Sequence, residues 1–104
     1  MKLIQKLSDM IEEEICDAEK YARCALENKE SDPGLADMFY KLANDEMGHM
    51  HTLHGQVVTQ IENYRREKGE PPEAMKMLYD ILHQKHIGNA ATVKGLLSIY
   101  RGDK

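Results

Sequence analysis

The sequence has no tryptophan, a single phenylalanine and only three prolines among its 104 residues. A hydrophobic core must therefore be built mainly from aliphatic side chains and from the seven methionines. The scarcity of proline permits long uninterrupted helices, and the abundance of Glu, Lys, Leu and Ala favours them. Because this length suits one folding unit, we expect a single all-α domain over residues 1–104.

Other absences narrow the function. No apolar run approaches the ~20 residues that cross a bilayer, and the first ten residues, MKLIQKLSDM, lack the apolar segment of a signal peptide. The formal net charge of −4 comes from interspersed acidic and basic residues, so the sequence lacks the clustered positive charge of a nucleic-acid-binding protein. Cys16 and Cys24 lie about 12 Å apart along one predicted helix, too far for a disulfide. We therefore expect reduced thiols, a cytoplasmic location, and neither a membrane nor a nucleic-acid partner.

Residues that typically end or start helices divide the chain at three points. Asp32 is a good N-cap residue and Pro33 suits a first helical turn, so a helix ends before them and another begins there. Gly69 and the Pro-Pro pair that follows it end the second helix and start the third. Gly88 marks a weaker break. The predicted helices are a long hairpin over 3–68, made of 3–29 and 33–68, and short C-terminal helices, 72–87 and 90–100.

Both long helices carry a row of mostly apolar residues at a period near 3.5, as in antiparallel bundles. The exceptions are Glu14, Glu46 and His49. The first row is Ile4, Leu7, Ile11, Glu14, Ala18, Tyr21 and Ala25. The second row is Leu35, Phe39, Leu42, Glu46, His49, Leu53, Val57, Ile61 and Tyr64.

These three polar residues are predicted to meet. Counted from a turn near Ser31, Glu14 lies about 25 Å back along the first helix. Glu46 and His49 lie about 22 Å and 27 Å forward along the second helix. Glu46 and His49 are also spaced i, i+3, so they share one helix face. The sequence therefore predicts a Glu–Glu–His trio at one level of the hairpin.

Buried carboxylates are costly unless they are paired or coordinated, and neither row offers a nearby Lys or Arg. A metal cation would compensate them, and oxygen-rich ligation with one imidazole suits iron, with manganese or zinc as alternatives. One Glu plus a Glu-x-x-His is half of a di-iron carboxylate site, and a two-fold dimer would supply the other half. The alternatives are a buried, hydrogen-bonded Glu–His pair, or polar residues in the rows that only specify helix register and oligomeric state.

Glu14 with Tyr21 seven residues later, followed by Glu46 and His49, resembles the first half of the ferritin-like superfamily. The likeness covers roughly residues 11–57. It is closer to the encapsulated ferritins, in which two short chains share one site, than to rubrerythrin, which has two helix pairs and a Cys-x-x-Cys iron site.

The resemblance implies a ferritin-like four-helix bundle on dimerisation, with Glu14, Glu46 and His49 as iron ligands and Tyr21 in a catalytic role beside them. It implies ferroxidase or O2/peroxide-reducing activity in iron handling or oxidative-stress protection, by a homodimer or higher homo-oligomer. An encapsulating shell is a further implied partner. However, the C-terminal TVKGLLSIYRG favours an ordinary packing helix over a targeting tail. The competing hypothesis is a non-enzymatic helical oligomerisation or interaction module with a structural or vestigial metal site.

Two other groups are weaker candidates. Glu12 and Glu13 predict a solvated face or, alternatively, an acidic patch that attracts cations. His54 lies off the apolar row, as a flanking histidine would. It is level with His83 and His86 of the third helix, so a second, histidine-rich cluster is geometrically possible.

Overall fold

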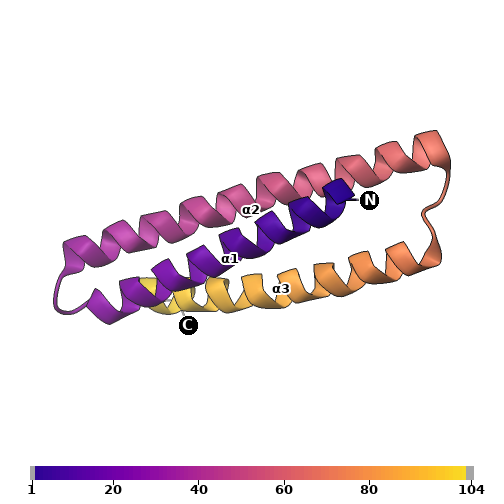
Figure 1. Ribbon diagram of the computed structural model, residues 1–104. Coiled ribbons are helices and arrows are strands. Elements are labelled where there is room, and N and C mark those ends of the chain that lie inside the picture. The colour runs from indigo at the N-terminus through magenta and orange to yellow at the C-terminus, as the bar shows by residue number, and fades with distance from the viewer. Residues whose placement is uncertain (1, 103–104) are drawn as a thin grey trace.

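The computed structural model describes residues 2–102, which form three helices and no strands in that range (Figure 1). They are α1 (Lys2–Asn28), α2 (Pro33–Lys68) and α3 (Glu73–Arg101). The molecule is a rod with principal extents of 55 × 20 × 18 Å. The all-α class is confirmed, whereas the four-helix bundle expected on dimerisation stays a prediction. No described helix combines the length and the apolar character needed to span a bilayer.

Local signals position the α1–α2 hairpin. The side chain of Asp32 accepts a hydrogen bond of 3.1 Å from the backbone N–H of Leu35, and Pro33 is the first residue of α2. At the other end Gly69 adopts a φ of +83°, and its N–H donates to the carbonyl of Arg65 at 3.0 Å. The left-handed region is accessible to glycine at little cost, which explains why α2 stops there. The predicted bounds of the long hairpin are thus confirmed to within a residue.

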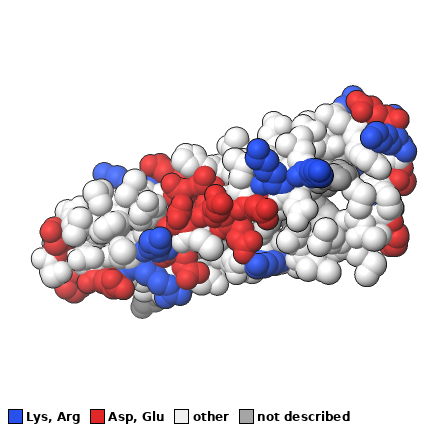
Figure 2. Space-filling model, in the orientation of Figure 1, with Lys and Arg blue, Asp and Glu red and all other residues white. Residues whose placement is uncertain are grey.

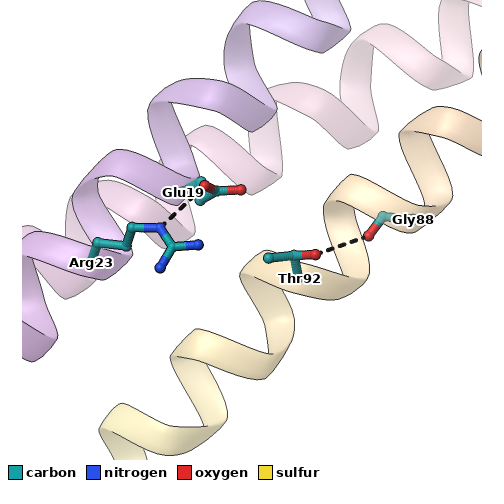
Figure 3. Close-up of polar contacts among 4 residues, drawn as sticks. All are labelled: Glu19, Arg23, Gly88 and Thr92. Carbon is teal, nitrogen blue, oxygen red and sulfur yellow. Dashed lines mark hydrogen bonds and ion pairs between the residues drawn. The ribbon is translucent and has the colours of Figure 1, made fainter.

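The predicted break at Gly88 is wrong, because α3 is one continuous helix where helices 72–87 and 90–100 were expected. The carbonyl of Gly88 accepts a hydrogen bond of 3.3 Å from the hydroxyl of Thr92, one turn further along the helix (Figure 3). The backbone therefore stays helical on both sides of the glycine.

Packing explains this continuity. Ala90, Val93 and Leu97 are buried just after the glycine, and their burial requires the last part of α3 to lie along its neighbour. A glycine inside a helix costs about 1 kcal/mol relative to alanine. Burying a single Val or Leu side chain contributes about 1.5–3 kcal/mol, so tertiary contacts outweigh the local preference.

The core follows from the position of α1, which packs against both α2 and α3, while α2 and α3 scarcely contact each other (Figure 1). A helix with two neighbours buries a stripe centred between them. The buried stripe of α1 keeps four residues of the predicted row and is displaced by one residue at the other three, so Leu7, Glu14 and Tyr21 are half-buried. The buried residues of α1 are Ile4, Ser8, Ile11, Ile15, Ala18, Ala22 and Ala25.

Candidate metal centre

The structure brings Glu14, Glu46 and His49 together. Nδ1 of His49 lies 3.5 Å from Oε2 of Glu14 on α1 and 3.7 Å from Oε2 of Glu46 on its own helix. One ligand atom from each residue falls within 4.8 Å of the other two, an arrangement that could hold a metal ion. Among the described residues, this is the only group of three acidic, His or Cys side chains with that property.

Burial within the trio is uneven. The side chains of Glu14 and Glu46 are 26% and 19% exposed, whereas that of His49 is 61% exposed. The two carboxylates are thus largely shielded from solvent, as their places in the apolar rows predict, whereas His49 is not shielded in the single chain. Oε2 of Glu14 is itself buried and has no hydrogen-bond partner in the described structure, since its 3.5 Å contact with His49 is an ion-pair contact. A buried carboxylate oxygen with only this contact is poorly compensated.

The trio faces away from α3. On α2, Tyr40 marks the side that meets α3, because its ring stacks on Tyr100 with a centroid distance of 4.7 Å. Glu46 follows Tyr40 by six residues, which places it about 120° around the helix. On α1 the α3 side is marked by Glu12, which pairs with Lys85 of α3 at 2.6 Å. Glu14 follows Glu12 by two residues, about 160° away around α1.

Apolar side chains border the trio on this uncovered side. Met10 precedes Glu14 by one turn, and Met38 precedes His49 by eleven residues, close to three full turns. Both methionines are exposed, and so are Leu3 on the same face of α1 and Leu35 on the same face of α2. The carboxylates and the imidazole thus lie on a side of the hairpin that α3 leaves open and that also carries exposed apolar residues.

Charge around the site is mainly negative on α1. Figure 2 shows acidic side chains gathered over the middle of this helix. Glu13 is exposed, as a solvated face requires. Glu12 departs from the simple prediction: it is half-buried and its hydrogen bond from Lys85 lowers the pKa of its carboxyl group. Glu19 is paired at 3.2 Å with Arg23 (Figure 3).

Tyr21 is half-buried on the same side of α1 as Glu14 and stacks against Phe39 of α2, with ring centroids 6.2 Å apart. Seven residues of helix separate it from Glu14, a rise of about 10 Å. At this distance Tyr21 could act on the ligands only through intervening groups, and its catalytic role stays a prediction.

The histidines proposed as a second cluster do come together. The rings of His54 and His83 stack with a centroid distance of 5.0 Å, and His86 lines the same pocket. Asp80, which is spaced to join them, is exposed and lies outside this pocket. The burial of His86 could not be read from the sequence, because it depends on how α3 packs beside α1 and α2.

Comparisons of the chain with protein-family models, with curated proteins and with solved structures found no match. The resemblance to the ferritin-like superfamily thus rests on the residues of the trio and their spacing, and it stays a prediction.

Proposed function

We propose that this protein binds iron through Glu14, Glu46 and His49, and that two copies share a di-iron carboxylate centre with ferroxidase or O2/peroxide-reducing activity. The observation that carries the proposal is the convergence of two carboxylate oxygens and one imidazole nitrogen within 4.8 Å. These donors suit iron or manganese better than ions that prefer thiolates.

The condition of Glu14 supports a cation at this position. Its Oε2 atom is buried next to a second carboxylate, that of Glu46, and only the His49 ring lies near enough to offset the negative charge. Two adjacent carboxylates repel each other, and a divalent ion between them removes both the repulsion and the cost of desolvation. The described residues therefore fit the metal that the resemblance implies.

The proposed dimer follows from the incompleteness of the site. Three protein ligands leave an octahedral ion open, and His49, the most exposed member of the trio, faces outward. A second copy related by a two-fold axis would present the same three residues from the other side and complete a Glu and Glu-x-x-His set on four helices. It would also cover exposed Met10 and Met38.

Each residue then has a defined task. The carboxylates of Glu14 and Glu46 hold the cation and balance its charge, and neutral His49 donates the lone pair of Nδ1, the atom nearest both carboxylates. Tyr21 of α1 and Phe39 of α2 stack on each other and pack the two helices together about two turns away from Glu14. Bound iron supplies the electron transfer to O2 or peroxide. The reduced cysteines Cys16 and Cys24 agree with the proposed cytoplasmic location.

An anaerobic titration tests the proposal. The apo protein is titrated with Fe2+ and then exposed to air, while bound iron and near-ultraviolet ferric absorbance are followed. We expect about one iron per chain, as two half-sites in a dimer require. Oxidation should be faster than in buffer. Glu46→Ala should abolish binding, whereas Glu13→Ala, an exposed glutamate on α1, should retain it. Wild-type protein that binds no iron, or Glu46→Ala that binds it equally well, contradicts the proposal.

The second candidate function is a helical oligomerisation or interaction module. The exposure of His49 favours it, because a solvated ring can contact Glu14 and Glu46 without any metal. The two functions differ in linkage: a resident metal raises the melting temperature, whereas a polar pair that only sets register leaves it unchanged on metal addition. Thermal unfolding of the dimer with and without Fe2+ under anaerobic conditions distinguishes them.

A further inference from the structure

We infer that His54, His83 and His86 form a second metal site, separate from the carboxylate trio, that takes a borderline divalent ion such as Zn2+ and ties α3 to α2. The donors are all imidazoles, and nitrogen-only sites suit Zn2+, Cu2+ or Ni2+ rather than the harder ions.

The geometry places the three rings around one pocket of about 230 Å³ between the helices. His54 comes from α2, and its ring stacks on that of His83 from α3 at a centroid distance of 5.0 Å and an interplanar angle of 19°. His86 follows His83 by three residues, so both share one face of α3. Ile11 and Met50 form part of the apolar lining of the pocket.

Two ring nitrogens in this cluster lack a protein partner. Nε2 of His54 and Nε2 of His86 are buried and make no hydrogen bond within the part of the chain that the structure describes. His86 as a whole is only 7% exposed. Buried imidazole nitrogens normally donate to or accept from a neighbour, and metal coordination satisfies a lone pair in the same way.

Burial favours the neutral form of two of the rings in this pocket. It is the main cause that lowers the pKa of both His54 and His86, with nearby His83 adding to the effect. Neutral imidazole is the form that donates a lone pair to a metal. The two rings are therefore suited to coordinate a metal ion.

The site is not closed as it stands. The three histidines do not bring three nitrogens within 4.8 Å, as the carboxylate trio does among the described residues, because His54 and His83 lie stacked. Rotation of at least one ring about its side-chain torsions would make the lone pairs converge. Since α2 and α3 have few other contacts, an ion held here would fasten the middle of α3 to α2.

The test removes the first site so that only the histidines can respond. The full-length Glu14→Gln/Glu46→Gln protein is stripped with a chelator and titrated with Co2+, followed by visible absorbance, and with Zn2+, followed by thermal unfolding. We expect about one Co2+ per chain with the intense bands of a four-coordinate ion. We also expect a rise in melting temperature of about 10 °C at a hundredfold excess of Zn2+ over its Kd.

A matched pair of variants in the same background assigns the site. His83→Ala should lose the Co2+ absorbance and the thermal shift, whereas Gln84→Ala, an exposed neighbour on α3, should keep both. Absence of Co2+ binding in the double variant overturns the inference, and so does a signal that survives His83→Ala.

If circular dichroism shows that His83→Ala is unfolded, a second measurement tests the inference. The imidazole ¹⁵N chemical shifts of the Glu14→Gln/Glu46→Gln protein, which keeps all its histidines, are then recorded with and without Zn2+. Zn2+ should move the resonances of His54, His83 and His86 while leaving that of His49, which lies outside this pocket, in place. Shifts confined to His49 overturn the inference.

Discussion

Two polar clusters lie on different faces of α2, and they differ in what covers them. Glu46 and His49 face the side that α3 leaves open, and they join Glu14 in an oxygen-rich, partly exposed group. His54 faces the side that α3 covers, where it meets His83 in a nitrogen-only group. Within one chain, coverage by α3 thus distinguishes a partly exposed site on the open side from a site that lies between the helices.

The more exposed cluster is nevertheless the one whose ligand atoms already converge. The open trio already has its three ligand atoms within 4.8 Å, because α1 and α2 form a tightly packed hairpin. The covered histidines are stacked rather than convergent, because α2 and α3 contact each other sparsely. Helix packing fixes the geometry of a site, and exposure alone does not.

The largest expected effect is on the dimer Kd, when an exposed methionine on the open side of α2 or on α3 is replaced by glutamate. Met38 lies on the open side of α2 and is 44% exposed, and Met77 on α3 is 58% exposed. If the open side is the dimer interface, Met38→Glu buries an unpaired charge in it and raises the dimer Kd on the order of 100-fold. Met77→Glu should leave the Kd unchanged. Sedimentation velocity over a dilution series measures both.

The reverse pattern, in which only Met77→Glu dissociates the dimer, would place the interface on α3. The two copies of the trio would then lie apart, and a shared di-iron centre would be ruled out.

A smaller effect should appear as pH falls, and it belongs to the covered side. Burial lowers the pKa of His54 and His86 in the folded protein. Below a pH of about 6.5 the unfolded chain therefore takes up protons that the folded chain does not. The stability contributed by the neutral rings is present above that pH and is lost as pH falls towards the lowered folded pKa. The charged or titratable groups that act on the two rings are His51, His83, Lys85 and Glu12, the last of which opposes the shift at His86.

Urea unfolding of metal-free protein between pH 7.5 and 5.5 measures this dependence. His86→Leu fills the same buried position without a titrating group, so its stability should vary less over the range. An equally steep profile in His86→Leu would mean that the pH dependence arises elsewhere in the molecule.

The smallest expected effect is a gain in stability when a helical glycine is replaced by alanine, once near each of the two polar clusters. A Cβ atom at Gly88 of α3 or at Gly48 of α2 would meet no atom within 4 Å. Gly88→Ala and Gly48→Ala should therefore each raise the free energy of unfolding by up to about 1 kcal/mol. Chemical denaturation measures both, and a loss of stability at Gly48, next to His49, would show that the trio tolerates no change in its helix.

The parts of the fold that local chemistry dictates could be predicted. Asp32 and Pro33 specify the start of α2 and Gly69 its end, so the hairpin needed no tertiary information. The meeting of Glu14 with His49 could be predicted as well, because the rise per residue of a helix is constant and both count from one turn.

The errors came from contacts that are distant in the sequence. Gly88 reads as a break unless the burial of Val93 on the far side of it is known. Likewise the burial of Ser8 and Ile15, one residue beyond the predicted row, reflects α3 lying beside α1. The exposure of His49 depends on which surfaces α3 reaches, and residue spacing within the hairpin carries no information about that.

The placement of the methionines gives the open side a chemical vulnerability. Met10 and Met38 present their thioethers at the surface, while Met47 and Met50 are shielded in the core. Conversion to the sulfoxide would reach the outer pair first and make an apolar row polar without disturbing the interior. Sulfoxide reductases could reverse that change, so the proposed self-association through this face would respond reversibly to oxidants.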